Sequence, residues 1–179
     1  MTDPKPTPAR TNPFWDFSLA LYASPQVQKA CLDLQDGSGV DVNVLLYMLW
    51  HGANQKQLTN EDARSVLAAI EPWRVDVVVP LRTARRNLKQ PAAAVDPQGA
   101  DTLRAIVKKA ELDAERLQQS ALFALKLQSA NTRATAPPRD CAKANAAAYA
   151  DALGRPLASA PLGVMLDALE AMLAAPRAI

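Results

Sequence analysis

The sequence has few of the residues, and none of the short motifs, that carry familiar enzyme chemistry. Its 179 residues include one histidine, His51, and two cysteines. It contains no GxGxxG or Walker A phosphate loop, no CxxC pair and no HExxH zinc motif. A Ser-His-Asp or Cys-His site would have to use His51. A structural role at a helix end, where the helix dipole favours a protonated imidazole, is the simpler interpretation. We predict no catalytic residue, no metal and no cofactor.

Long apolar runs and a strong excess of charge are also absent. The longest apolar run, Val44–Trp50, is far shorter than the ~20 residues that a membrane span needs. The opening stretch MTDPKPTPARTNP has no apolar segment of the kind that signal peptides contain. The net charge of +2 is too small to favour a polyanionic partner for the whole chain. Cys31 and Cys141 are expected to be reduced thiols, with a disulfide as the alternative. We therefore expect a cytoplasmic protein without a membrane span.

What is present favours helices. Hydrophobic residues make up 49% and charged residues 21%, which is typical of a globular protein. Alanine is abundant and β-branched residues are few. We predict an all-α fold: a helical bundle of about five main helices in a core domain over residues 12–130, plus an alanine-rich C-terminal helical hairpin over residues 140–179. A flexible tail over residues 1–11 and a linker over residues 131–139 complete the chain.

Capping residues and helix breakers set the expected helix boundaries. Asn12, Ser24 and Asp41 mark helix starts, the first two because proline follows them, and Gly52 marks a helix end. The expected helices run over residues 13–22, 25–35, 42–50, 60–70, 73–89, 100–130, 140–153 and 162–174.

Pro80 is the one proline that falls inside an expected helix. An interior proline removes a hydrogen bond and clashes with the preceding turn, so we predict a bend there. The run of β-branched residues over 75–79 makes a short strand the alternative.

Residues 14–50 hold most of the aromatic side chains and have the least generic pattern in the chain. The helix over residues 42–50 is apolar on all sides apart from Asn43, so we expect it to be buried and central to the fold. Asp16 and Asn43 are polar residues in otherwise apolar helices and need hydrogen-bond partners. Either they stabilise the core, with Asp16 paired to arginines, or they contact a ligand.

Three acidic residues lie close together before the central helix. Asp41 is expected to cap that helix. Asp33 and Asp36 lie one helical turn apart and are either solvated charges or ligands of one magnesium ion. The spacing does not match a calcium-binding EF-hand loop, and the first interpretation is the simpler one.

A basic stripe lies on one face of the helix over residues 73–89. Arg82, Arg85, Arg86 and Lys89 follow i, i+3, i+4, i+7 spacing. Such a stripe suits phosphate groups, but no aromatic residue lies among these cations to stack on bases. We therefore do not expect a nucleic-acid partner.

The helices on either side of the loop over residues 90–99 are expected to be antiparallel neighbours. A simple register sets Arg82 near Glu111, and Arg74 near Glu115, two carboxylates whose mutual repulsion the arginines would relieve. The simpler interpretation is an interhelical ion network. The alternative is a polar pocket that the network lines and that is open on one side.

A 4-3 spacing of mostly small residues predicts the packing seam of the helix over residues 100–130. Small residues favour packing within the bundle over a self-sufficient coiled coil. The seam consists of Leu103, Val107, Ala110, Ala114, Leu117, Ala121 and Ala124. The amphipathic helix over residues 162–174 either docks on the bundle with the rest of the hairpin or reaches a partner.

Several separated motifs resemble a family of small uncharacterised bacterial proteins. The stretches FWDFSLALY, CLDLQDGSGVDVNVLLYMLW, VVVPLRTARRNLK and AELDAER are similar to FWxFSLxLY, CLxLQDxxGxDVNxLLxxLW, VVxPLRxxRRxLK and AELEAER. The resemblance covers roughly residues 13–128, with Asp113 where the motif often has glutamate, and leaves residues 131–179 outside. It implies no activity. It implies only that certain residues lie in family motifs, namely Trp15, Asp41, Asn43, Trp50, Pro80, Arg82, Arg86, Glu111 and Glu115.

These features identify neither a reaction nor a ligand. The leading hypothesis is a cytoplasmic, non-catalytic helical protein that binds a protein partner, self-association included, or regulates an assembly. The alternative is a small-molecule pocket, binding or enzymatic, for a phosphate- or carboxylate-bearing ligand. Its candidate ligand-binding residues are Asp16, Asp41, Asn43, Trp50, Arg82, Arg86, Glu111 and Glu115.

Overall fold

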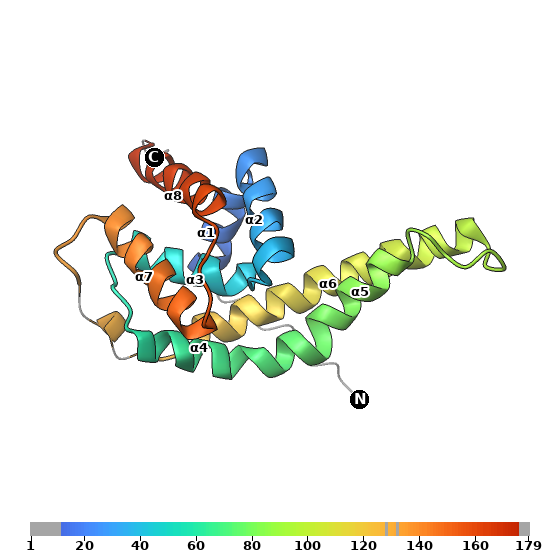
Figure 1. Cartoon of the computed structure of the whole chain (residues 1–179), viewed down its shortest axis with the longest axis horizontal. Helices are drawn as coiled ribbons and strands as arrows, with labels where there is room; N and C mark the ends of the chain where they lie inside the picture. The colour runs from blue at the N-terminus through green and yellow to red at the C-terminus, as the bar shows by residue number, and fades with distance from the viewer. Residues whose placement is uncertain (1–11, 128, 132, 176–179) are drawn as a thin grey trace, which may run out of the picture.

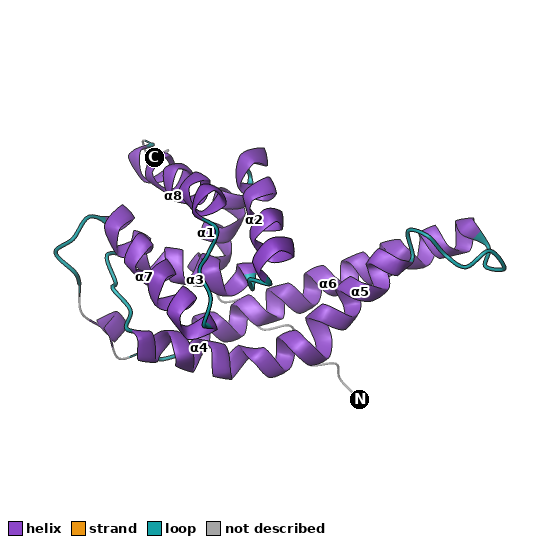
Figure 2. Ribbon diagram, viewed as in Figure 1, coloured by secondary structure: helices purple, strands orange, loops and turns teal. Residues whose placement is uncertain are grey.

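The computed structural model describes residues 12–127, 129–131 and 133–175, so the expected tail over residues 1–11 lies outside the described residues. Every regular element in these ranges is a helix, which confirms the predicted all-α class (Figure 2). In chain order the elements are α1 (Pro13–Tyr22), α2 (Pro25–Ser38), α3 (Val42–Ala53), α4 (Asn60–Trp73), the π-helix η1 (Arg74–Val78), α5 (Val79–Asn87), α6 (Pro97–Ala124), the 3₁₀-helix η2 (Ser129–Asn131), α7 (Pro138–Leu153) and α8 (Ser159–Ala174).

The helices form a body and a projecting arm (Figure 1). In the body, α3 packs against α1, α2, α6 and α7, while α8 covers α2 and α4 lies against α7. The arm consists of α5 and the first part of α6, which lie side by side and are joined by a loop at the tip. The second part of α6 returns into the body, so α6 connects the two regions.

Helix α3 is the centre of the body, as its apolar pattern predicts. Eight of its twelve residues are buried. The prediction that Gly52 ends this helix was wrong, because α3 continues to Ala53. A Cβ atom on Gly52 would lie 2.3 Å from the backbone of Ala142 in α7. Gly52 therefore allows α3 and α7 to approach closely, and it does not end the helix.

The segment from α4 to α5 is one long helix that contains a widened turn. The sequence predicted two helices, over residues 60–70 and 73–89, but Pro72 lies inside α4, and η1 follows directly and leads into α5. The Val79 N–H donates to the Arg74 carbonyl five residues earlier, and Pro80, which has no N–H, follows at once. Proline and π-turns are the usual causes of a bend in a long helix. Figure 1 shows the helix changing direction between α4 and α5, which confirms the predicted bend, and the π-helix there makes the strand alternative wrong.

The predicted seam of α6 was mostly wrong. Leu103 and Leu117 are 49% and 59% exposed, and Ala114 is the one member of the seam that is buried. The buried face carries Ala100, Glu111, Ala114, Gln118, Gln119 and Leu122. Apolar spacing failed as a guide because this helix turns a polar face toward the body.

The C-terminal helices pack against the body, which answers the question that the sequence left open. Helix α7 packs along α3, and α8 packs along α2. Tyr149, Met165 and Leu169 are each 0% exposed. The division of the chain into a core domain, a linker and a hairpin stays a prediction.

Cys31 and Cys141 are both free and buried, so the disulfide alternative is not realised. None of the helices in the described ranges is both long and apolar enough to cross a membrane.

Candidate functional site

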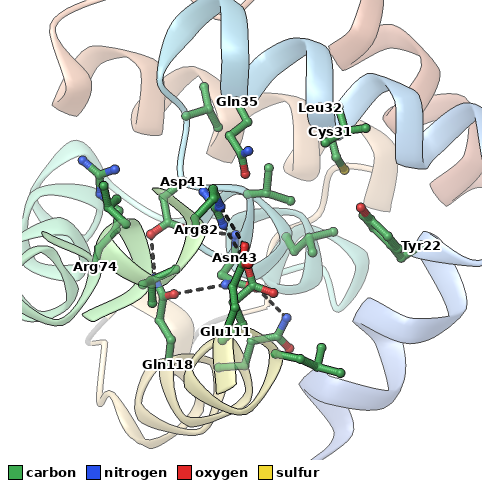
Figure 3. Close-up of a pocket in the computed structure, with 18 of the residues that line it drawn as sticks. Tyr22, Cys31, Leu32, Gln35, Asp41, Asn43, Arg74, Arg82, Glu111 and Gln118 are labelled. Atoms are coloured by element: carbon green, nitrogen blue, oxygen red, sulfur yellow. Dashed lines mark hydrogen bonds and ion pairs between the residues drawn. The ribbon is translucent and has the colours of Figure 1, made fainter. Parts of the chain in front are cut away.

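A cavity of about 570 Å³ lies where the arm leaves the body (Figure 3). Its volume is in the range of pockets that hold small ligands. One wall comes from α1 and α2, a second from the start of α3 and the turn before it, and a third from η1, α5 and α6. The cavity is therefore bounded by segments from both halves of the chain.

Most of the predicted site residues line this cavity. Those that do are Asp41, Asn43, Arg82, Arg86, Glu111 and Glu115. Asp16 and Trp50 do not line it. The buried face of α1 carries Phe14 and Ser18, and Asp16 lies on the exposed side, so the expected pairing of Asp16 with arginines is wrong. Trp50 packs in the core, with its ring centroid 5.7 Å from that of Phe14.

An ion network joins α5 to α6 along the cavity wall. Arg82 Nε lies 3.1 Å from Glu111 Oε1, and Arg82 Nη2 lies 2.7 Å from Glu115 Oε1. Arg85 also pairs with Glu111. The predicted interhelical network is thus confirmed, and it is also part of the cavity. The predicted pairing of Arg74 with Glu115 was wrong, because Arg74 pairs with Glu71 at 2.8 Å on its own helix.

The two glutamates of this network differ in their pKa values. Burial opposes the charge of Glu111, but hydrogen bonds from Arg85 and Arg82 outweigh this effect and lower its pKa. For Glu115 burial dominates, and the pKa is raised despite the opposing effect of Arg82. The same wall therefore holds one carboxylate that is firmly ionised and one whose charge is less stable.

Arg86 of the basic stripe is also paired. Arg86 Nη2 lies 2.8 Å from Asp36 Oδ1, and both side chains are about half exposed. Lys29 pairs with Asp33 at 2.7 Å. The residues that the structure describes contain no group of three or more His, Cys, Asp and Glu side chains that could hold a metal ion. Asp33 and Asp36 thus each engage a cation of the protein.

A chain of side-chain hydrogen bonds crosses from α3 to α6 at the wall of the cavity. Gln118 Nε2 donates to Asp41 Oδ2 at 2.6 Å, and Asn43 Nδ2 donates to Gln118 Oε1 at 3.0 Å. Gln119 Nε2 donates to Asn43 Oδ1 at 2.8 Å. Figure 3 shows Asp41, Asn43 and Gln118 turned toward one another from these elements. The partners that Asn43 needs are therefore two adjacent glutamines.

The sequence interpretation missed Gln118 and Gln119, although a signal was available. Glu111, Glu115, Gln118 and Gln119 follow i, i+4, i+7, i+8 spacing, which places four polar residues on one face of a helix. A continuous polar face on a helix that returns to the core predicts a buried polar network.

Asp41 is held firmly at the start of α3. It caps the helix as predicted, since its Oδ1 accepts from the N–H groups of Asn43 at 2.9 Å and Val44 at 3.3 Å. The Tyr149 hydroxyl, from α7, accepts from the backbone N–H of Asp41 at 3.0 Å and donates to its carbonyl at 3.3 Å. Burial raises the pKa of Asp41, and its hydrogen bond from Gln118 opposes that shift.

The rest of the cavity lining is apolar and partly open. Leu19, Leu32 and Leu112 line it and are 53%, 50% and 55% exposed. Tyr22 and Cys31 lie next to each other on this side (Figure 3). Burial raises the pKa of the Cys31 thiol to about 12, so this cysteine is protonated and a weak nucleophile. The lining of the cavity thus combines exposed leucines with amides and ion pairs.

His51 does not line the cavity, and the prediction of a protonated imidazole was wrong. The ring is buried, with its centroid 4.5 Å from that of Tyr47 and 4.8 Å from that of Trp50. Burial lowers its pKa to about 4, more than the nearby Asp62 raises it. Desolvation therefore outweighs the helix dipole.

Comparison with protein-family models matches residues 13–122, more than half of the chain, to the family described as "Protein of unknown function (DUF2390)". No curated protein and no solved structure matches the chain. Tyr149, which holds the backbone of Asp41, lies outside the matched residues.

Proposed function

Since the chain belongs to this family of unknown function, we propose from the cavity itself that the protein binds a small ligand between its body and its arm. The observation that carries the proposal is the cavity of about 570 Å³, whose lining combines apolar side chains with buried polar ones. Natural ligand sites combine a mostly apolar lining with a few fixed polar groups in this way. The proposal places the protein in the cytoplasm, where its two free cysteines stay reduced.

The charges around the cavity favour a ligand that carries a carboxylate or a phosphate. Arg74, Arg82, Arg85, Arg86 and Lys108 line it, against four carboxylates. Arg82 and Arg85 are engaged by Glu111, but the Arg86–Asp36 pair is half exposed and therefore weak. An anionic group of a ligand can compete with Asp36 for Arg86. The apolar part of the same ligand would lie against Leu19, Leu32 and Leu112.

A thermal-shift screen of carboxylates and phosphates tests the proposal, with nucleotides, coenzyme A esters and prenyl diphosphates included. A ligand at 100 times its dissociation constant stabilises the protein by about 2.7 kcal/mol. Leu112→Trp should fill the cavity and abolish the shift. Leu103→Trp is the matched control, because Leu103 is similarly exposed on the same helix and does not line the cavity. A screen without hits, or hits that survive Leu112→Trp, would reject the proposal.

A second candidate is the binding of a protein partner by the arm. Leu103, Ile106 and Leu117 share one face of α6 and are 49%, 62% and 59% exposed. Exposed apolar residues on one helix face are typical of protein contact surfaces. A pull-down at native expression should recover a partner with the wild-type chain and lose it with Leu103→Ser combined with Ile106→Ser. Equal recovery by both chains would exclude this surface.

A further inference from the structure

The hydrogen-bond chain at the cavity wall has a direction. Each of its three amides gives an N–H to the next member on the side of Asp41 and turns its carbonyl oxygen the other way. The order is Gln119, Asn43, Gln118, Asp41. Side-chain amides can occupy either orientation, so something must select this one.

Asp41 selects the direction because an ionised carboxylate can only accept hydrogen bonds. Its Oδ1 accepts from two backbone N–H groups at the start of α3, and its Oδ2 accepts from Gln118. All the groups around it donate, which matches the deprotonated form. Gln118 must give its N–H to Asp41, so its carbonyl is left for Asn43, and the Asn43 carbonyl is left for Gln119. The reverse order would place the Gln118 carbonyl against the carboxylate.

The chain ends on an acceptor that has no partner. Gln119 lines the cavity and is 4% exposed, and among the described residues its Oε1 makes no hydrogen bond. A buried acceptor without a donor is unfavourable, because it has lost its water and gained nothing. Hydrogen bonds in series also polarise one another, so the carboxylate at one end strengthens the acceptor at the other.

We propose that the ligand of this cavity presents a hydrogen-bond donor, an N–H or O–H group, to Gln119 Oε1, and that Asp41 imposes this preference through the amide chain. The inference rests on the proposed function and adds the chemistry of the ligand at one position. The carboxylate or phosphate of the ligand lies toward Arg86 and Lys108, and the donor group lies toward Gln119. Asp41 is a positioning residue in this scheme, since it acts through Gln118, Asn43 and Gln119.

A single substitution should reverse the preference. In Asp41→Asn one side-chain oxygen still caps α3, and asparagine is as good a cap as aspartate. Its new N–H group must donate to the Gln118 carbonyl, which turns every amide of the chain around. Gln119 then offers its NH₂ group, and the cavity favours an acceptor. Asp96→Asn is the control, because Asp96 also caps a helix, accepting from Gln98 and Gly99 with its two carboxylate oxygens on the exposed arm, and takes no part in the chain.

The probes are indole and quinoline, neutral bicyclic aromatics of similar size at pH 7.5. Indole carries one N–H donor, whereas quinoline carries one ring nitrogen that accepts. Dissociation constants are measured by ¹⁵N NMR titration of the full-length chain, with the side-chain amide resonances of Gln119 as the reporter. We expect wild type and Asp96→Asn to bind indole about tenfold more tightly than quinoline, the size of one hydrogen bond. The ratio should invert in Asp41→Asn.

Gln119→Leu provides a second variant that does not depend on reversal of the chain. It removes the acceptor, so indole should lose its tenfold advantage while quinoline binding is unchanged. If both probes bind in the cavity but Asp41→Asn and Gln119→Leu leave their ratio as in wild type, the donor preference is wrong and the binding function stands. If neither probe shows saturable binding in any of the four proteins, the donor preference is wrong, and the thermal-shift screen of carboxylates and phosphates decides the binding function separately.

Discussion

Helix α3 and the arm are held in place by different forces. Eight of the twelve residues of α3 are buried, whereas α5 has no buried residue and Leu103 and Ile106 of the arm are half exposed or more. Ion pairs join α5 to α6 within the arm. Hydrogen bonds from the polar face of α6 join it to the start of α3 in the body. Packing therefore fixes the apolar core, and polar contacts fix the angle of the arm. The cavity lies at the junction, where both apolar and polar side chains are available.

The largest expected contrast is the loss of one leucine in each region. Leu49→Ala in α3 should destabilise the protein by about 4 kcal/mol, because the side chain is 0% exposed and its removal leaves a cavity. Leu103→Ala in the arm should change stability by less than about 0.5 kcal/mol. Urea unfolding of both variants measures the difference. Equal losses would mean that the arm is packed as tightly as the body.

The second contrast is the pH dependence of stability. Burial lowers the pKa of His51 from 6.5 to about 4, so the folded protein favours the neutral imidazole. The stability that this shift contributes is present above pH 6.5 and is lost as the pH falls toward 4, on the order of 3 kcal/mol. His51→Phe should remove that dependence in urea titrations between pH 7 and pH 4.

The arm should respond to pH in a separate range. The lowered pKa of Glu111 contributes stability that is present above its ordinary value of 4.5 and is lost as the pH falls below it. Glu111→Gln should therefore flatten the acid end of the curve and leave the decline between pH 6.5 and 4.5 in place. A curve that His51→Phe leaves unchanged would show that the buried imidazole is not responsible.

Two glycines provide a third contrast. Gly52→Ala in α3 should cost about 2 kcal/mol, because its Cβ would meet the backbone of Ala142 at 2.3 Å and α7 would have to move. Gly99→Ala in the arm should cost about 1 kcal/mol, because the nearest atom is the Asp96 carboxylate oxygen at 2.9 Å, which can move away only by giving up its cap hydrogen bond from the Gly99 N–H. Thermal unfolding compares them, and a Gly52→Ala protein as stable as wild type would rule out close helix contact there.

The smallest expected effect is the coupling between Arg82 and Glu115. A double-mutant cycle with alanine at both positions should give about 1 kcal/mol, since the side chains are 19% and 27% exposed. The coupling should shrink in 1 M salt, where the Debye length falls to about 3 Å. The loss of stability caused by Leu49→Ala should not depend on salt in this way. A coupling that is insensitive to salt would mean that the pair contributes through packing.

The predicted site was partly right because one of its contacts joins two regular helices that are close together in the sequence. The α5–α6 pairing follows from two helices joined by a short loop, so the contact of Arg82 with Glu111 could be counted along the chain. Arg74 failed in the same register, because a carboxylate three residues away, Glu71, was nearer. The position of Asp16 depended on how α1 rotates about its axis, which its mostly apolar pattern left open.

The sequence by itself determined the helices, the central place of α3 and the cap at Asp41. These features depend on prolines, capping residues and apolar spacing that act within a few residues. Only the tertiary structure decided which polar residues meet across the fold. Gln118 reaches Asp41 from 77 positions away, and Tyr149 reaches it from 108. Such pairs depend on how α6 and α7 rotate against α3, and the free energy that selects the rotation is summed over the whole core. For this reason the open acceptor of Gln119 can be seen only in the folded chain.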